Sequence, residues 1–237
     1  MADSEPVQRK IVIVLHRDPG SPGAVGQWLE EQGYALDIRR PKFGDDLPED
    51  LAAYSGAIVF GGPDSANDDH PFIRAEIRWI EQVLAAGTPY LGICLGGQML
   101  ANVLDAPVRK HDDGLVERGY YPLSASPEGK AFCSDWPSHV YQWHQEGFEI
   151  PRSTQVLATS SGAFPNQAFL YGASCIGLQF HPEITFRMVD RWSRREEQLE
   201  YPGAHDRQTH FAQHLLFSDD VRIWLGGFLK NWLKNDK

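Results

Sequence analysis

The sequence predicts an α/β fold: an open, mostly parallel twisted sheet with helices on both faces, followed by an antiparallel β-rich part and C-terminal helices. Three observations predict it. In the first half, short apolar runs alternate with amphipathic helical segments, which is the pattern of parallel βα units. From residue 108 to about 180, short strands follow one another through short links. After Pro182 the helical periodicity returns.

The expected strands of the first half are continuous apolar runs, as in strands that are buried on both faces of a sheet. They cover residues 11–15, 35–38, 57–60 and 89–93, and the helices cover residues 24–32, a segment that begins at Pro71, and residues 98–104. Pro71 suits a first helical turn because its missing N–H has no partner there. Gly33 and Gly87 are placed to end the first two helices.

The second half predicts more strands and then two helices. The strands are expected at residues 116–123, 140–143, 156–159, 168–171 and 176–180, and the helices at residues 186–199 and 218–233. We expect a frayed segment over residues 1–9. Residues 10–237 show no linker, so we expect one domain with a C-terminal helical extension from about residue 185.

Composition excludes several classes of function. The net charge is −10, from 22 basic and 32 acidic residues, which disfavours nucleic acid and anionic membranes as partners. The N-terminus has no apolar signal-like run and no apolar stretch is long enough to span a bilayer, so we expect a cytoplasmic protein. The three cysteines form no CxxC pair, and we expect neither a metal site nor a cofactor.

The most informative segment surrounds Cys94. Gly92-x-Cys94-x-Gly96 joins an expected strand to an expected helix, and it is the cysteine form of a nucleophile elbow. Glycines permit the sharp turn and close packing that lift the sulfur clear of the sheet. The N-terminus of the following helix favours a thiolate. Cys133, in an expected polar loop, and Cys175, at a strand start, lack such a turn and are expected to be structural.

A cysteine nucleophile needs a base, and the base needs a group that orients it. Nine histidines are present, and His181 is the best candidate because it follows an expected strand at the edge where functional groups gather in open α/β sheets. Glu183 lies two residues on, where a carboxylate can hold the imidazole's tautomer.

Three motifs in this order resemble the class I (triad-type) glutamine amidotransferases: GGP from Gly61, GICLGGQ around Cys94 and QFHPE around His181. The resemblance covers roughly the first 185 residues and implies a flavodoxin-like sheet. Residues 141–151 and 166–169 resemble the stand-alone branch related to the amidotransferase domain of GMP synthase. That branch also includes plant enzymes that hydrolyse γ-glutamyl peptides.

The resemblance implies a role for each site residue. Cys94 would attack the γ-carbonyl of glutamine to form a thioester, with His181 as base and acid and Glu183 as its orienter. Backbone N–H groups of Gly62 and Leu95 would form the oxyanion hole. The substrate contacts would come from Gln98, Trp143, His144 and Gln145.

Three functions remain open at this stage. The first is a glutaminase that passes ammonia to a synthetase partner chain, since the sequence carries no P-loop or other ATP motif. The second is a γ-glutamyl peptide or amide hydrolase with the same triad. It is favoured by Gln145-Glu146, which stands where the related branch often has Gly-Asp. The third is a non-catalytic regulatory protein on the same fold.

The C-terminal helices carry no motif. The charged segment 187–200 is expected to be a solvated helix face. Aromatic residues nearby favour packing on the core, with a homo-oligomer interface or a synthetase docking surface as alternatives; they are Trp192, Trp224, Phe228 and Trp232.

Overall fold

The computed structural model describes residues 9–234, and its main feature is one eight-stranded sheet with the order β2-β1-β3-β4-β12-β11-β10-β7. In the first half the elements are β1 Lys10–Val14, α1 Gly23–Glu31, β2 Ala35–Arg39, a 3-10 turn Pro41–Phe43, β3 Gly56–Val59, α2 Pro71–Ala85, β4 Tyr90–Ile93 and α3 Leu95–Val103. In the second half they are β5 Val108–Lys110, β6 Glu117–Pro122, β7 Ser124–Ala125, α4 Pro127–Phe132, β8 His139–His144, β9 Glu146–Phe148, β10 Gln155–Thr159, β11 Asn166–Tyr171, β12 Cys175–Leu178, α5 Phe186–Ser193, α6 Glu196–Leu199 and α7 Arg207–Lys234.

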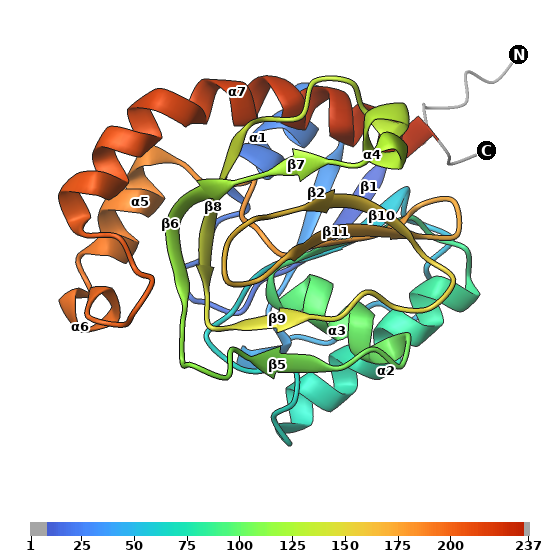
Figure 1. Ribbon diagram of the computed structural model, residues 1–237. Helices are drawn as coiled ribbons and strands as arrows, with labels where there is room; N and C mark the ends of the chain where they lie inside the picture. The colour runs from blue at the N-terminus through green and yellow to red at the C-terminus, as the bar shows by residue number, and fades with distance from the viewer. Residues whose placement is uncertain (1–8, 235–237) are drawn as a thin grey trace, which may run out of the picture.

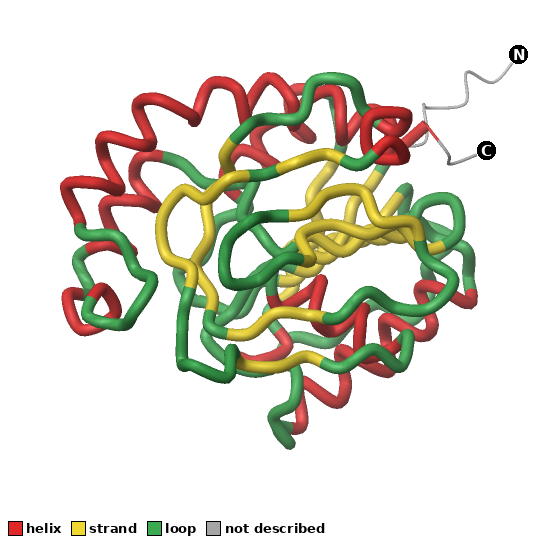
Figure 2. The backbone as a smooth tube through the Cα atoms, in the orientation of Figure 1, coloured by secondary structure: helices red, strands yellow, loops and turns green. Residues whose placement is uncertain are grey.

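The predicted fold class is confirmed. Strands β2, β1, β3, β4 and β12 run parallel, and β11, β10 and β7 continue the sheet in antiparallel pairs. Two small antiparallel pairs, β5–β9 and β6–β8, lie outside the main sheet (Figure 2). Most of the segment expected to be frayed, residues 1–8, lies outside the described residues.

Helices cover both faces of the sheet, as its apolar strands require. Alternate residues of β1 point to opposite faces: Ile11 and Ile13 pack in one core cluster with α1 and α7, and Val12 and Val14 in a second with α2 and α3. Figure 1 shows α1 and α7 on one side of the sheet and α2 with α3 on the other. Burial on both faces explains why these strands have no polar alternation.

Several predicted bounds were wrong. Helix α3 begins at Leu95 rather than at residue 98, because Gly96 and Gly97 are helical here despite their low propensity. The short strands β5, β7 and β9 and the helix α4 were not predicted. Cys133 is not in a polar loop: it directly follows α4 and is buried.

The C-terminal helices also differ from the prediction. The expected helix 186–199 is broken between α5 and α6 at Arg194 and Arg195, and α7 begins eleven residues before the expected position, at Arg207. The first part of α7 buries His210 and His214, whose Nδ1 atoms lie 3.0 Å and 2.8 Å from the hydroxyls of Tyr141 and Tyr120. The inner face of this first part of α7 is therefore polar, and a search for apolar residues at helical spacing cannot find this part of the helix.

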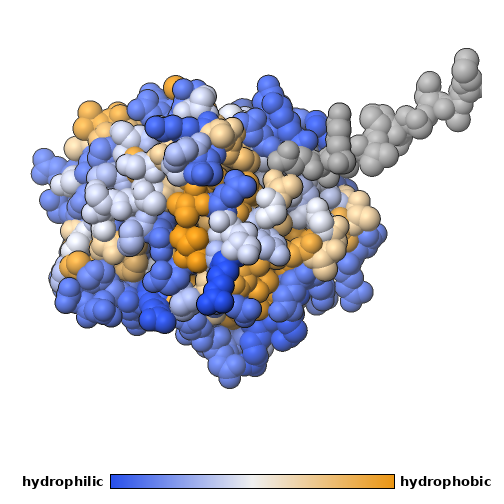
Figure 3. All heavy atoms as spheres, turned by 45° about the vertical axis from the view of Figure 1, so that its right-hand side comes forward, coloured by the Kyte–Doolittle hydropathy of each residue, from blue (hydrophilic) through white to orange (hydrophobic). Residues whose placement is uncertain are grey.

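The aromatic residues of α7 pack on the core. Trp224, Phe228 and Trp232 are at most 1% exposed, and Trp232 Nε1 donates to the carbonyl of Ser174 at 2.9 Å. They are therefore not available as a surface for another chain. On the face drawn in Figure 3, apolar side chains gather in a central hollow while the surrounding surface is mostly hydrophilic. Within residues 9–234, no helix combines the length and the hydropathy that crossing a membrane requires.

The packing of α7 gives a stability prediction. Trp232→Ala should lower the free energy of unfolding by about 3–5 kcal/mol, because it leaves a large cavity in the core. Ile223→Ala is the control on the same helix: Ile223 is 70% exposed, and a change within about 0.5 kcal/mol is expected. Urea denaturation of both variants measures the difference, and equal losses would contradict the docking of α7.

Candidate active site

Cys94 lies between β4 and α3, at the N-cap of the helix. Its φ is +51°, a left-handed backbone conformation that non-glycine residues rarely adopt. Its backbone N–H donates to the carbonyl of Leu178 on the neighbouring strand β12, at 2.8 Å. The sequence therefore folds here as the predicted strand-turn-helix, with strain held at the cysteine.

The glycines around Cys94 allow α3 to pack directly on the sheet. A Cβ added at Gly92 would lie 2.4 Å from the carbonyl carbon of Gly96, and one added at Gly96 would lie 2.1 Å from the carbonyl oxygen of Val59. A Cβ at Gly97 would lie 2.6 Å from the carbonyl oxygen of Leu178. Each position is closed to a larger residue because backbone, which cannot move aside cheaply, is the obstacle.

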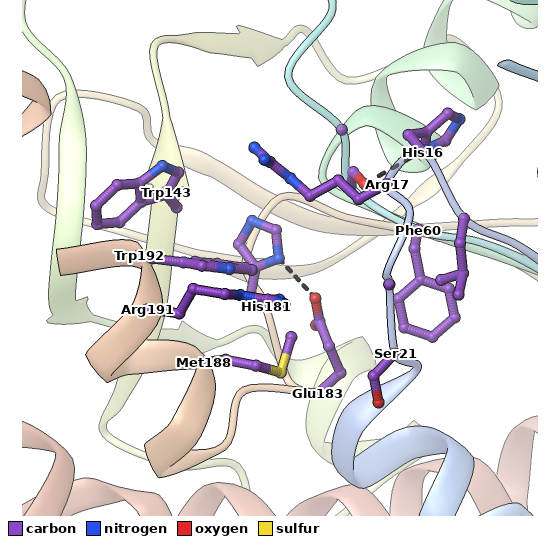
Figure 4. A pocket seen from close by; sticks show the side chains of 14 residues that line it. His16, Arg17, Ser21, Phe60, Trp143, His181, Glu183, Met188, Arg191 and Trp192 are labelled. Atoms are coloured by element: carbon purple, nitrogen blue, oxygen red, sulfur yellow. Dashed lines mark hydrogen bonds and ion pairs between the residues drawn. The ribbon is translucent and has the colours of Figure 1, made fainter. Parts of the chain in front are cut away.

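His181 and Glu183 approach Cys94 from the loop that follows the carboxyl end of β12. His181 Nδ1 lies 2.8 Å from Glu183 Oε1, and both side chains are almost fully buried. The edge of the His181 ring packs against Trp192, with centroids 5.0 Å apart (Figure 4). A Cβ added at Gly61 would lie 2.7 Å from His181 Cε1 and 3.4 Å from Cys94 Cβ, so the ring and the cysteine share one small space.

The environment of His181 favours its charged form. Burial by itself lowers the pKa of the imidazole, but the negative charges of Glu183 and of a Cys94 thiolate outweigh burial and raise that pKa to about 10. The Nε2 atom is buried and forms no hydrogen bond that meets the geometric limits within the described part of the chain. Its electrostatic neighbour is Cys94. A proton on Nε2 is thus placed on the side of the ring opposite Glu183.

A cavity of about 340 Å³ opens beside Cys94. The structure brings together around it the residues predicted for the oxyanion hole and for substrate contacts: Gly62, Leu95, Gln98, Trp143, His144 and Gln145. Leu95 is the first residue of α3, so its N–H has no partner within the helix. A second cavity on the His181 side shares Gly62 and Trp143 with the first, so the two adjoin (Figure 4).

The substrate-contact residues differ in how they face this cavity. Gln98 is buried, and its Nε2 donates to the carbonyl of Glu146 at 2.8 Å. The His144 ring is held by Glu117 Oε2 at 3.2 Å and Gln142 Oε1 at 3.1 Å. Gln145 is exposed and lines the cavity.

Sequence reasoning missed two groups behind the site. Gln179 Nε2 lies 3.9 Å from Cys94 Sγ, and its Oε1 accepts from Gln98 at 3.4 Å; its place within the QFHPE motif was the available signal. His16 lies between Glu76 Oε2, at 2.8 Å, and the carbonyl of Gly61, at 3.3 Å. This fully buried pair supports the Gly61–Gly62 turn, and nothing in the sequence pairs residues 16 and 76.

A third group was predicted wrongly. The segment 187–200 is not only a solvated face, because Arg195 lines the cavity of Cys94 together with Gln198, and Arg191 lines the adjoining one. The break between α5 and α6 brings Arg195 and Gln198 to the cavity wall, and helical periodicity could not place that break.

One group of metal-ligating side chains is found within residues 9–234. Ligand atoms of Asp64, Asp68 and His70 lie within 4.8 Å of one another. Lys42 Nζ already binds Asp64 Oδ2 at 2.6 Å, which supplies the positive charge that an ion would bring. We therefore assign no metal to these residues.

Comparisons with known proteins show the family of this chain. The family model described as Glutamine amidotransferase class-I matches residues 20–191. The chain belongs to this family. A glutamine amidotransferase-like protein of Salmonella typhimurium, YfeJ, is 31% identical over 200 residues, covering 80% of this chain and 82% of that protein. Membership supports glutamine hydrolysis as the general activity.

Other relatives agree at the level of domain and fold. The glutamine-hydrolysing GMP synthase of Porphyromonas gingivalis is 34% identical over 142 residues, which cover 58% of this chain but 26% of that protein. Among solved structures, a glutamine amidotransferase of Methylobacillus flagellatus superposes with a TM-score of 0.89 at 25% identity, covering 96% and 95% of the two chains. One of Thermotoga maritima gives 0.86 at 29% identity, covering 96% and 99%.

The charge on His181 is open to measurement. In the free protein the imidazole should stay protonated through neutral pH and lose its proton near pH 10. Because the folded pKa lies above the ordinary 6.5, this group stabilises the fold fully below about pH 6.5, and the contribution disappears as the pH rises through about 10. NMR of ¹⁵N-labelled histidine measures the titration.

Glu183→Gln and Cys94→Ser should each lower the pKa of His181, since each removes one of the charges that raise it. His139 is the internal control, because burial is the cause of its lowered pKa and neither substitution touches it. A His181 titration that is identical in all three proteins would refute the proposed coupling.

Proposed function

We propose that this protein hydrolyses the γ-amide of glutamine through a cysteinyl thioester on Cys94. The observation that carries the proposal is the arrangement of one strained cysteine, at a helix N-terminus, beside a buried imidazole that is oriented by Glu183 at 2.8 Å. Such a nucleophile, base and orienter form the general pattern of covalent acyl transfer.

In the first half-reaction the Cys94 thiolate attacks the δ-carbon of glutamine. The N–H groups of Gly62 and Leu95, two residues that line the same cavity as the sulfur, would donate hydrogen bonds to the oxyanion that forms. The C–N bond then breaks, and His181 donates its Nε2 proton so that ammonia departs. The glutamyl thioester remains on Cys94.

In the second half-reaction His181, now neutral, removes a proton from water. The hydroxide attacks the thioester, the C–S bond breaks, and glutamate leaves with the thiolate restored. Glu183 holds the same imidazole tautomer throughout, since it accepts from Nδ1 in both halves. Gln98 would contact the amide group of the substrate, and the backbone of residues 143–145 would hold its α-amino and carboxylate ends; all of them line the same cavity. The ammonia would serve an acceptor on a synthetase partner.

Substitution of Cys94 tests this mechanism. Cys94→Ser should lower glutamine turnover by a factor of about 10³ or more, because the thioester cannot form. Acid quenching of the wild-type reaction should leave a glutamyl group on the peptide that contains Cys94, detected by mass spectrometry. Cys133→Ala is the matched control and should retain activity. Full turnover by the Cys94 variant would exclude a thioester at this residue.

A specific observation favours a second candidate, the hydrolysis of γ-glutamyl peptides or amides by the same triad. The segment after α5 lines the Cys94 cavity with Arg195, Gln198 and Tyr201, so this segment supplies one wall of the site. A wall of this kind can contact whatever is attached to the γ-nitrogen.

The two candidates differ in their best substrate. If the second holds, kcat/KM for at least one γ-glutamyl amide with a substituted nitrogen should equal or exceed that for glutamine, because extra contacts with the leaving group stabilise the transition state. A coupled assay for glutamate compares all substrates on one scale. Turnover of glutamine far above every substituted amide would leave only the first candidate.

A further inference from the structure

The cavity beside Cys94 contains a cluster of cationic side chains. Arg17 follows β1, Arg118 lies on β6 and Arg195 lies between α5 and α6, and all three line this one cavity. Within residues 9–234 none of them forms an ion pair with a carboxylate, although most of the other ion pairs of the described chain involve an arginine or lysine. In a chain of net charge −10, three unpaired guanidinium groups in one cavity require an explanation.

Arg118 is the most constrained of the three. It is 4% exposed, and its Nε is buried without a hydrogen-bond partner in the described part of the chain. One terminal nitrogen donates to the carbonyl of Gln198, and the guanidinium lies 4.7 Å from the ring of Tyr201 and 5.8 Å from that of Trp143. Burial lowers the pKa of this side chain. A buried cation with an unused donor is costly unless an anion completes its surroundings.

Arg17 adds mutual repulsion to the cluster. Burial, then the positive charges of Arg195 and Arg191, lower the pKa of Arg17 and outweigh the opposing effect of the Asp64 carboxylate. Figure 4 shows its guanidinium end extending above His181 toward Trp143, and therefore toward the wall that carries Arg118. Like charges held together in this way are stabilised by an anion bound between them.

The carboxylates of the cavity wall form no ion pair with these arginines within residues 9–234 and have other partners, although the charge of Asp64 still reaches Arg17. Asp64 binds Lys42 Nζ at 2.6 Å, and Glu146 Oε2 accepts from Ser65 Oγ at 2.7 Å. A glutamine zwitterion brings a single carboxylate to this cavity. Three guanidinium groups exceed what one carboxylate neutralises, since a single bidentate arginine already pairs with it.

We propose that Arg17, Arg118 and Arg195 form a carboxylate subsite for the leaving group, so that the substrate is a γ-glutamyl amide whose amine carries a carboxylate, as in a γ-glutamyl amino acid. This inference rests on the proposed thioester chemistry at Cys94. The amide C–N bond breaks, the amino acid departs with a proton from His181, and water then releases glutamate from the sulfur. Atoms and charge balance without any further reactant.

Two substrates that differ by one carboxylate test the subsite: γ-glutamylglycine and γ-glutamylmethylamide. Wild-type kcat/KM should be roughly 10-fold or more higher for γ-glutamylglycine, because a charge-assisted pair with a guanidinium contributes at least that factor. Arg17→Gln and Arg195→Gln should each remove most of this preference, because kcat/KM falls far more for γ-glutamylglycine than for the methylamide. Arg187→Gln, on an exposed part of α5, is the control and should change neither substrate.

Arg118→Met should have the same effect, but Arg118 is buried and the variant can fail to fold; the half-buried Arg17 and Arg195 decide the test in that case. Equal wild-type rates on the two compounds would overturn the proposal. So would equal losses on both compounds in the arginine variants, because the cluster would then bind the α-carboxylate that both compounds share.

Failure of the thioester chemistry gives a different result, namely no glutamate from any compound. Calorimetric binding of the two compounds to Cys94→Ala then decides the subsite independently of turnover. Tighter binding of γ-glutamylglycine that is lost on Arg195→Gln would support the carboxylate subsite, and equal affinities would overturn it.

Discussion

The close approach of α3 to the sheet at Cys94 is the constraint on which the rest of the site depends. Backbone atoms of β3, β4 and β12 fill the space beneath the turn, so that Gly92, Gly96 and Gly97 have no room for a side chain. The cysteine is thereby fixed in a left-handed conformation at the start of a helix. Because β12 hydrogen-bonds to β4, the chain that leaves β12 reaches the sulfur at once, and His181 needs no long loop to arrive there.

Electrostatics divides the site into two regions. On one side of Cys94, Glu183 and His181 form a buried pair with opposite charges, and aromatic rings from β8 and α5 pack against each other beside it. On the other side, the cavity is polar and carries an excess of guanidinium groups. The buried pair has little interaction with solvent ions. In the open cavity, by contrast, solvent ions screen the charges and can exchange with one another. A single cysteine between the two regions can thus face both a proton carrier and an anionic ligand.

The sequence predicted the parts of this protein that depend on local chemistry. Apolar runs revealed the parallel strands, and glycine spacing revealed the turn at Cys94, because only glycine fits where backbones touch. His181 and Glu183 were found since both follow one strand. What escaped prediction depends on distant segments. His16 and Glu76 are partners across 60 residues, and α7 begins on buried histidines that look like surface residues in the sequence. Arg195 was misread as solvated because the break before α6 has no proline or glycine to mark it.

The segment between Ser193 and Arg207 has a consequence for how this protein can change over time. The turn of Cys94 is locked between strands and tolerates almost no substitution, but the outer wall of its cavity is contributed by α6 and the chain beside it, which pack on the periphery of the molecule (Figure 1). Mutation can therefore remodel one wall of the cavity while the bond-breaking groups stay in place.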